Sequence, residues 1–352
     1  MVLLKSLTTA IIMKIALVTD AWKPQTNGVV NTLSNLTETL RSKGNEVDVI
    51  EPQQFNTIKL PKYNEIQIAV NPWRAIKMLN SVRPEYIHIC TEGPIGLAVR
   101  VWCSFKRIPF TTSYHTKFPE YFKIYLRIPV WLGYLYVSWF HNYACRTMVS
   151  TKNLQRELHS KINKTEFWRR GVNTNLFNPN KKKKLPYKGP IWLNVGRISP
   201  EKNLEAFLKL ELPGTKIVVG DGPMLKNYRQ RYPEVIWTGY KFGEDLSEYY
   251  ASSDVFVFPS LTETFGNVCL ESIVSGTPVV SYNVNGPTEI IRDGVTGIIC
   301  DDLRDGCFKA LELDREEVAK EASFWSWSNS CLLYTSDAAD ERSSVDLGGR
   351  RI

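Results

Sequence analysis

The chain reads Asp254-Val-Phe-Val-Phe-Pro-Ser260 and, one helical stretch later, Pro278-Val-Val-Ser-Tyr282. Both runs are short, apolar and bounded by turn residues, a pattern typical of buried parallel strands. Between them lies Glu263-Thr-Phe-Gly-Asn-Val-Cys-Leu-Glu271. We expect a helix to begin near residues 264–266 and to close before Gly276. The stretch therefore predicts a strand–loop–helix–strand unit of a doubly wound α/β domain.

Two glutamates bracket this helix start. Glu263 would lie in the loop and Glu271 about two turns along, roughly 12 Å away at the rise of an α-helix. That separation is comparable to the distance between the hexose and the ribose of a sugar nucleotide. Gly266 would permit close approach of a ligand, and the free N–H groups of Thr264, Phe265 and Gly266 would face it. The alternative is a pair of solvated helix carboxylates.

Length and composition narrow the class of protein. With 352 residues the chain is too long for one ordinary core and indicates two domains. The net charge of +8 favours an anionic partner: a nucleotide sugar, an anionic membrane or nucleic acid. Seven cysteines without a Cys-x-x-Cys pair predict neither a disulfide framework nor a zinc site, which fits a reduced cytoplasm. The histidines lack metal-ligand spacing; they are His88, His115, His141 and His159.

Strand and helix patterns alternate in two series, which predicts two Rossmann-like domains facing an interdomain cleft. We place the N-terminal domain at residues 13–172, a linker at 173–190 and the C-terminal domain at 191–330. The linker is rich in Asn, Pro and Lys and includes Lys181 to Lys184, which we interpret as solvated or, second, as a membrane contact. The predicted strands cover residues 14–19, 47–50, 86–90, 110–114, 147–150, 191–195, 216–219, 235–237, 255–258 and 279–282.

Both ends of the sequence look foreign to the fold. Residues 1–12 run into the first strand without a cleavage region, so we expect an upstream mis-start and a true start at Met13. Composition shifts near Cys331 to small and polar residues. Because this segment can be encoded by a transposon-end adapter, we expect residues 331–352 to be a non-native tail. The C-terminal domain would then be truncated.

A phosphate site is predicted where residues 191–195 end. Ser199 is suited to cap a helix, Pro200 to its first position, and Lys202 to its third. Arg197 and Lys202 would then flank a positive helix end that attracts a diphosphate. The alternative is an ordinary capped surface helix with a lysine in its first turn.

Two further loops follow strands of the N-terminal domain. Asn27-Gly28 opens a helix after the first strand, although a lone glycine can simply mark a turn. His115 follows residues 110–114, at the strand edge where open α/β sheets bind ligands. A lone histidine is more often structural, so its interpretation depends on context.

These motifs together resemble retaining GT-B glycosyltransferases of family 4, or group 1, and look most like the bacterial GDP-mannose-dependent α-mannosyltransferases. The similarity spans about residues 14–328. It includes Tyr114-His-Thr-Lys-Phe-Pro-Glu-Tyr121, Gly196-Arg197, Lys202 and the Glu263–Glu271 segment. It also includes 19–20, Pro24, 27–29, 91–94, 170–172 and 220–223. Missing is the family's C-terminal helix, which would begin near Trp325-Ser-Trp327.

The resemblance implies roles for these residues. The donor, GDP-mannose or a UDP-hexose, would contact Gly28, Arg197, Lys202, Glu263, Thr264, Phe265, Gly266 and Glu271. The acceptor would meet Asp20, Asn27 and His115. Catalysis would use His115, Glu263, Arg197 and Lys202, without a metal or another cofactor. The reaction would move a hexose, first of all mannose, to a lipid or glycan with α linkage.

Alternatives remain at this point. One is glucosyl, galactosyl or sulfoquinovosyl transfer from a UDP-sugar to a diacylglycerol-type lipid. Others are a different GT-B enzyme, such as a sugar-nucleotide epimerase, and a non-catalytic anion-binding protein. Residues 121–141 are aromatic, apolar and basic but too short to span a bilayer, which needs about 20 residues. They fit either a packed helix or a peripheral contact with an anionic membrane on the cytoplasmic side. No nucleic-acid-binding motif occurs.

Overall fold

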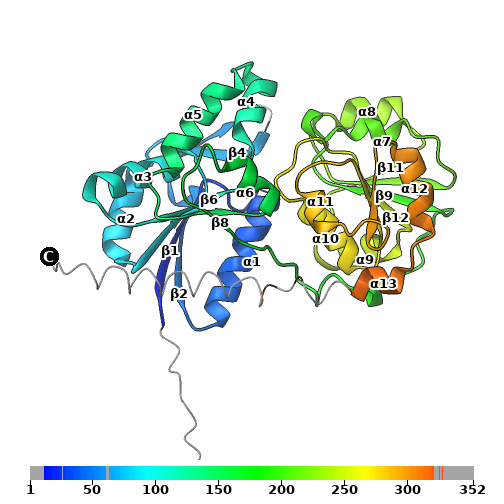
Figure 1. Cartoon of the computed structure of the whole chain (residues 1–352), viewed down its shortest axis with the longest axis horizontal. Helices are drawn as coiled ribbons and strands as arrows, with labels where there is room; N and C mark the ends of the chain where they lie inside the picture. The colour runs from blue at the N-terminus through cyan, green and yellow to red at the C-terminus, as the bar shows by residue number, and fades with distance from the viewer. Residues whose placement is uncertain (1–11, 26, 61–62, 321–324, 326, 328–352) are drawn as a thin grey trace, which may run out of the picture.

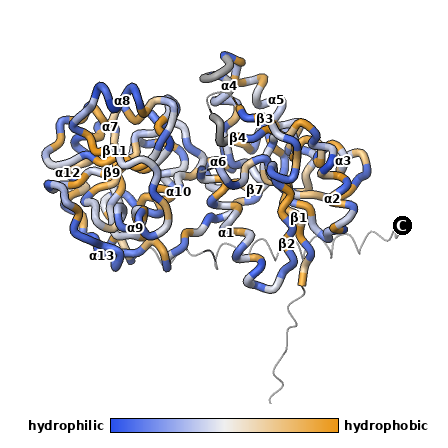
Figure 2. Tube along the Cα trace, turned by 180° about the vertical axis from the view of Figure 1, so that it is seen from behind, coloured by the Kyte–Doolittle hydropathy of each residue, from blue (hydrophilic) through white to orange (hydrophobic). Residues whose placement is uncertain are grey.

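The computed structural model describes residues 12–25, 27–60, 63–320, 325 and 327. The predicted upstream segment, except Ile12, and the predicted tail 331–352 lie outside these residues. The described chain forms two α/β halves, each built around its own parallel sheet (Figure 1). Apolar residues follow the strands of both sheets, and polar residues cover much of the outer helices (Figure 2). The two Rossmann-like halves with parallel sheets expected from the sequence are therefore confirmed.

The N-terminal sheet has six parallel strands in the order β2-β1-β5-β6-β7-β8. A separate antiparallel pair, β3 and β4, lies beside it. The strands are β1 (Lys14–Val18), β2 (Glu46–Ile50), β3 (Thr57–Leu60), β4 (Tyr63–Ala69), β5 (Tyr86–Ile89), β6 (Thr111–Tyr114), β7 (Thr147–Val149) and β8 (Thr165–Phe167). Its helices are α1 (Gly28–Ser42), α2 (Arg74–Val82), α3 (Pro94–Lys106), α4 (Phe118–Leu126), α5 (Val130–His141) and α6 (Lys152–Leu158), with a 3₁₀ turn at Pro52–Gln54.

The C-terminal sheet repeats this plan with six parallel strands in the order β11-β10-β9-β12-β13-β14. They are β9 (Ile191–Val195), β10 (Thr215–Val219), β11 (Ile236–Gly239), β12 (Val255–Phe258), β13 (Val279–Ser281) and β14 (Gly297–Ile299). The helices are α7 (Leu204–Leu208), α8 (Leu225–Arg231), α9 (Gly243–Ser252), α10 (Asn267–Val274), α11 (Pro287–Ile290), α12 (Leu303–Leu311) and α13 (Arg315–Lys320), with 3₁₀ turns at Pro179–Lys181 and Pro200–Lys202.

The predicted strands appear within two residues of their expected ends, and β9 and β12 match at both ends. The side chains of β9 and β12 are buried on both faces of the sheet, which explains why each of these strands has an uninterrupted apolar run. Strands β3, β4, β8 and β14 were not predicted. β3 and β4 form the separate antiparallel pair, and β8 and β14 are three-residue strands at sheet edges.

The segment predicted as a linker packs on the C-terminal domain. Phe177 lies edge-on to Tyr250, with ring centroids 5.7 Å apart, inside the core formed by β9, β12 and α10. Lys181 pairs with Glu244 at 2.6 Å, and Lys183 pairs with Glu248, both on α9. Two lysines of the run therefore pair with carboxylates of α9, while Lys182, Lys183 and Lys184 remain exposed to solvent.

Two tryptophans show the chain returning toward the N-terminal domain. Trp325 packs against Phe265 of the C-terminal domain, and its carbonyl accepts a hydrogen bond from the Val172 N–H at 2.8 Å. Trp327 packs against Trp168 in the N-terminal core, with centroids 6.3 Å apart. These contacts lie where the resemblance places the start of a crossing helix.

The aromatic stretch 121–141 is divided between two helices. α4 ends at Leu126 and α5 begins after Pro129, because proline cannot continue the earlier hydrogen-bond ladder. Gly133 of α5 lies so close to Pro119 that an added Cβ would come within 2.7 Å of its Cα. Among the described residues, no helix is both long and apolar enough to cross a bilayer.

Candidate active site

The ends of the two sheets meet through loops rich in polar groups. Thr264, after β12, donates its hydroxyl to the carbonyl of His115, after β6, at 2.7 Å. Its own carbonyl accepts from Ser150 Oγ, after β7, at 3.0 Å. α10 and α11 face α1 and α6 across this junction (Figure 1). The carboxyl ends of parallel strands thus come together, where such sheets place their ligands.

Lys202 and Glu263 form an ion pair in this junction. Lys202 Nζ donates to Glu263 Oε2 at 2.8 Å, and Glu263 Oε1 accepts from the Thr264 N–H at 3.2 Å. Burial by itself would lower the pKa of Lys202, but the Glu263 carboxylate raises it above its ordinary value. Lys202 is therefore a fixed positive charge that Glu263 holds in place.

The local structure around Lys202 differs from the prediction. Residues 200–202 form a 3₁₀ turn, and Asn203 follows in the left-handed region with φ 50° before α7 begins. Ser199 does not cap the turn, because its hydroxyl donates to Glu201 Oε1 at 2.6 Å instead. Ser199, Pro200 and Lys202 thus stand at the predicted cap, first and third positions, but the turn is a 3₁₀ turn and the cap makes no side-chain hydrogen bond to it. In this structure the anionic partner of Lys202 is the Glu263 carboxylate.

The helix after Glu263 also begins later than expected. α10 starts at Asn267, and Gly266 precedes it with φ 96°, a conformation that favours glycine. Thr264 and Phe265 therefore belong to the loop, and their N–H groups are not the helix's free donors. Phe265 is buried, and the Arg170 guanidinium lies 5.3 Å from the centre of its ring. Thr264, Phe265 and Gly266 thus shape the loop between the two glutamates.

Glu271 lies within α10, as predicted, and is buried. The Tyr250 hydroxyl of α9 donates to its Oε2 at 2.9 Å. Burial raises the pKa of Glu271 to about 7, and the Tyr250 hydrogen bond opposes this increase. Near neutral pH the carboxyl group can therefore be either charged or neutral, and a ligand that prefers one form selects it. Sequence reasoning missed Tyr250 because it lies 21 residues earlier in the chain.

His115 is buried beside Arg170. Arg170 Nη2 donates to His115 Nδ1 at 2.8 Å, so Nδ1 is unprotonated and Nε2 carries the ring hydrogen. Burial, followed by the charge of Arg170, holds the pKa of His115 well below its usual value. Among the described residues, Nε2 has no hydrogen-bond partner. His115 is therefore a neutral imidazole with one buried donor left to offer.

Asn267 connects this pair to the first helix of the N-terminal domain. Its Oδ1 accepts from Arg170 Nη1 at 3.4 Å, and its Nδ2 donates to the Gly28 carbonyl at 3.0 Å. A Cβ on Gly28 would stand 3.3 Å from that amide, which explains a small residue there. Asn27 caps α1 by accepting from the N–H groups of Val29 and Val30. The predicted glycine loop thus opens a capped helix at the domain junction.

The structure gives Asp20 a contact within its own domain. Oδ1 accepts from the Ile95 N–H at 2.8 Å, and Oδ2 accepts from the Gly96 N–H and the Thr91 hydroxyl. Both oxygens thus bind the start of α3. Burial raises the pKa of Asp20 to about 6 despite these bonds. Its predicted contact with an acceptor stays a prediction.

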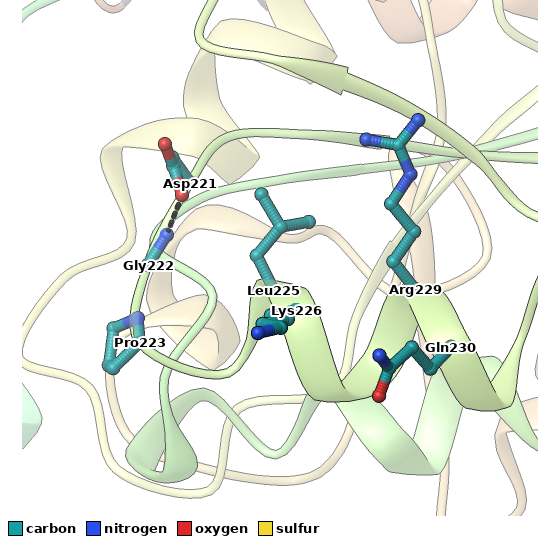
Figure 3. Close-up of a pocket in the computed structure, with 7 residues that line it drawn as sticks. All are labelled: Asp221, Gly222, Pro223, Leu225, Lys226, Arg229 and Gln230. Atoms are coloured by element: carbon teal, nitrogen blue, oxygen red, sulfur yellow. Dashed lines mark hydrogen bonds between the residues drawn. The ribbon is translucent and has the colours of Figure 1, made fainter.

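A hollow of about 570 Å³ opens beside the end of β10. Its wall runs from the Asp221-Gly222 turn along α8, where Lys226 and Arg229 project (Figure 3). Gly222 lies close to the loop after β9: an added Cβ would be 2.3 Å from the Ile198 carbonyl oxygen.

Arg197, next to Ile198, is half-buried. Burial raises the pKa of Tyr121 on α4, and the charges of Lys202 and Arg197 oppose that increase.

The structure places the predicted site residues at several positions, with Arg197 in the loop after β9. Those at the domain junction are Gly28, Asn27, His115, Lys202, Glu263, Thr264, Phe265 and Gly266, while Glu271 lies behind them in α10 and Asp20 caps α3. None of them lines the α8 hollow. The described residues contain no group of three or more His, Cys, Asp or Glu side chains suited to hold a metal ion.

Two family models match this chain. Glycosyltransferase Family 4 matches residues 26–176, and Glycosyl transferases group 1 matches residues 177–306. The two models meet within the segment between the sheets and together cover both domains. The chain belongs to the glycosyltransferases described by these two models, family 4 and group 1.

Named relatives and solved structures agree with that assignment. The glycosyltransferase is 28% identical to a GDP-mannose-dependent alpha-mannosyltransferase of Mycobacterium tuberculosis, over 81% of this chain and 83% of the relative. It is 27% identical to the alpha-monoglucosyldiacylglycerol synthase of Streptococcus pneumoniae, over 82% and 75%. The fold resembles sucrose-phosphate synthase from Thermosynechococcus elongatus with a TM-score of 0.78 and 19% identity, covering 94% of this chain and 99% of that one.

Proposed function

We propose that the glycosyltransferase moves a hexose, first of all mannose from GDP-mannose, to a hydroxyl of a lipid or glycan acceptor with retention of the α configuration. The observation that carries this proposal is the Lys202–Glu263 pair, held against His115 of the other domain through Thr264. A fixed cation, a carboxylate and a neutral hydrogen-bond donor thereby meet where the two sheets face each other. In the transfer of a sugar from an anionic leaving group, the cation would stabilise the leaving charge, and the carboxylate and the donor would orient the sugar.

Each group has a role in the proposed reaction. As the bond between the anomeric carbon and the diphosphate oxygen breaks, negative charge grows on that oxygen. Lys202 and Arg197 would stabilise this charge. Glu263 would orient the hexose, and the free Nε2–H of His115 would donate to a sugar hydroxyl near the reacting carbon. Glu271 would accept from the ribose. The acceptor hydroxyl would attack from the face that the diphosphate leaves, and a departing phosphate oxygen would take its proton.

The domains would divide the substrates between them. The C-terminal domain supplies Lys202, Glu263 and Glu271 and would bind the donor. The N-terminal domain would bind the acceptor beside His115, with Asn27 and Asp20 further along the same sheet edge. The protein would act in the cytoplasm or at the inner face of the membrane, without a divalent metal.

A second donor and acceptor pair is favoured by one relative. The Streptococcus pneumoniae protein is named a monoglucosyldiacylglycerol synthase, which suggests a UDP-hexose and a diacylglycerol-type lipid. In the mannosyltransferase proposal, GDP-mannose would be turned over and UDP-hexoses would not. The opposite preference would favour this second candidate.

One assay tests both candidates. The protein is incubated with GDP-mannose, UDP-glucose or UDP-galactose, with and without lipid and glycan acceptors, and nucleoside diphosphate release is measured. We expect release to depend on an acceptor and the product to carry an α linkage by NMR. Release without any acceptor would indicate a hydrolase or epimerase instead, and a β-linked product would contradict retention.

A further inference from the structure

An apolar stripe runs along the outer face of α5 in the N-terminal domain. Trp131, Leu135 and Trp139 are 63%, 59% and 48% exposed and recur every four residues, so they lie on one face of the helix. Leu132 beside them is 43% exposed. The opposite face is buried in the domain through Gly133, Val137 and Phe140. A helix packed in a core would instead present polar residues on its outer side.

α3 extends this stripe. Its Arg100 guanidinium lies over the rings of Trp139 and Tyr143, at 3.8 and 4.8 Å from their centres. The same side chain donates to the carbonyls of Phe140 and Trp139 at the end of α5. α3 itself exposes Val101 and Phe105, the latter by 81%. We name these seven residues the α3–α5 surface: Val101, Phe105, Trp131, Leu132, Leu135, Trp139 and Tyr143.

The charge around this surface is strongly one-sided. Residues 94–151 contain one carboxylate, Glu120, which accepts from the Tyr134 hydroxyl at 2.8 Å. The same range contains seven cationic side chains. Among them Lys106 ends α3, Lys123 lies in the last turn of α4, and both are exposed. The others are Arg100, Arg107, Lys117, Arg127 and Arg146, of which Lys117 pairs with Glu157 and Arg146 with Glu166. The cations that this surface offers to an anionic partner are therefore Lys106, Arg107, Lys123 and Arg127, all exposed.

We propose that the α3–α5 surface docks the protein on an anionic lipid bilayer, with α5 lying in the interface. Exposed tryptophans beside lysines and arginines suit the boundary between acyl chains and anionic headgroups. α5 has 12 residues, about 18 Å at the helical rise. It is therefore too short to cross the hydrocarbon core of about 30 Å and would lie along it. The outer edge of the domain presents α5 between α3 and α4 (Figure 1).

The charge favours a bilayer over a second copy of this chain. A symmetric dimer through this surface would bring the same cations of both copies together, which opposes association. An anionic bilayer instead neutralises them. The inference rests on the proposed function only in one respect: a lipid acceptor in the bilayer would explain why the protein docks there. The binding itself needs no sugar donor.

Vesicle sedimentation tests the surface directly. The protein is mixed with vesicles of phosphatidylglycerol and phosphatidylcholine, or of phosphatidylcholine alone, without donor. We expect binding to the anionic vesicles that weakens as salt is added. Trp131→Ser/Leu135→Ser should lower the affinity by about tenfold or more, because two exposed apolar anchors are lost. The matched control, Tyr240→Ser/Phe242→Ser, removes an exposed aromatic pair of the C-terminal domain and should bind like the parent.

Two charge-reversal variants distinguish the effect of this surface on binding from the effect of net charge. Lys106→Glu/Lys123→Glu should reduce binding to anionic vesicles by about tenfold. Lys182→Glu/Lys184→Glu changes the net charge equally but lies in the linker, and it should have little effect. Equal losses in both variants would show that net charge alone draws the protein to lipid. A loss confined to the linker variant would place the contact there, and either result would overturn the proposal.

Further readouts keep the test decisive. Circular dichroism and thermal unfolding check that each variant is folded, and Trp131→Phe should keep most of the binding. Absence of binding by the parent protein would overturn the proposal, as would parent dimers that only Trp131→Ser/Leu135→Ser dissociates. Binding of GDP and UDP is measured in parallel. A protein that binds vesicles but no nucleotide would contradict the proposed function and leave the surface standing, and the reverse result would do the opposite.

Discussion

At the scale of single residues, the junction gives its cations side-chain partners before any substrate arrives. Lys202 is tied to Glu263, and Arg170 is tied to a neutral His115. A diphosphate that approached Lys202 would share the cation with Glu263 and release part of the carboxylate for the hexose. The same pair would thus bind the donor and respond to the charge that develops during transfer.

Lys202→Ala tests this role. We expect kcat to fall by about 10²–10³, the effect of losing one preorganised donor to a developing negative charge. Lys202→Arg should restore only part of the loss, because a planar guanidinium does not reproduce a point charge. Lys209→Ala, which removes an exposed cation of the same domain, serves as the control. Steady-state kinetics decide the matter: a raised KM at unchanged kcat would make Lys202 a binding residue only.

Glu271→Ala should weaken donor binding. Loss of a hydrogen bond between a carboxylate and the ribose costs about 1.5–3 kcal/mol, or roughly 10- to 150-fold in Kd. Calorimetric titration with the nucleoside diphosphate measures the change. A donor Kd equal to that of the parent would remove Glu271 from the nucleotide site.

Donor binding should also depend on pH through Glu271. Burial raises the pKa of this carboxyl group to about 7, so it gains a proton as the pH falls through that value. The protonated form is a weaker acceptor for ribose hydroxyls, and affinity should decrease by up to about tenfold for each pH unit below the pKa. Glu271→Gln should bind weakly at every pH and show a flat profile. An equally steep profile in Glu271→Gln would assign the titration to another group.

At the scale of elements, the site depends on where helices begin. The turn 200–202 and the left-handed Asn203 carry Lys202 toward the loop after β12. Gly266 and the late start of α10 leave Glu263 in a loop that reaches the other domain, while Glu271 stays inside the helix. A continuous helix at either place would have changed the direction of these side chains.

Gly266→Ala tests the second element. At φ 96° an alanine costs about 1–2 kcal/mol, while its Cβ would meet Cys269 Sγ at 3.5 Å, an ordinary contact. We expect a lower Tm and a marked loss of kcat. Gly44→Ala carries a similar backbone cost at φ 89°, with nothing within 4 Å, so its Tm should fall without loss of activity. Equal activity in both variants would show that the loop conformation does not matter for transfer.

At the scale of the whole molecule, many hydrogen bonds connect the two domains around the junction. Glu289 of α11 accepts from the N–H groups of Lys152 and Asn153 at the start of α6. Asn285 donates to Glu157 of α6 at 2.9 Å. These bonds hold His115 against the Glu263 loop, so the site is complete only when both domains contribute to it.

Removal of metal ions should leave activity nearly unchanged. Lys202 and Arg197 supply the positive charge that a divalent ion would otherwise provide, and the described residues offer no cluster of metal ligands. Transfer is measured after dialysis against EDTA, with magnesium and manganese added back. Activity that disappears and returns with either ion would contradict the metal-free mechanism.

The sequence by itself determined the two parallel sheets and the family. Strands such as β9 and β12 are buried on both faces, so their apolar runs are complete local signals. The order of strands and glycine-rich turns then places Glu263, His115 and Arg197 at strand ends, where parallel sheets expose ligand sites. The antiparallel pair β3 and β4 and the edge strands β8 and β14 escaped prediction; β3, β8 and β14 are short and largely half-exposed or exposed, so they carry no such signal.

Only the tertiary structure decided which groups touch. Lys202 meets Glu263 across 61 residues, and Arg170 meets His115 across 55. Ser199 had the right position to cap a helix, yet its hydroxyl donates to Glu201, and the chain leaves the turn through a left-handed Asn203. The spacing of residues along the chain determines which contacts a side chain can make within one helical turn. Partners distant in the chain are fixed by packing, which places Arg170 beside the buried His115 and Tyr250 beside the buried Glu271.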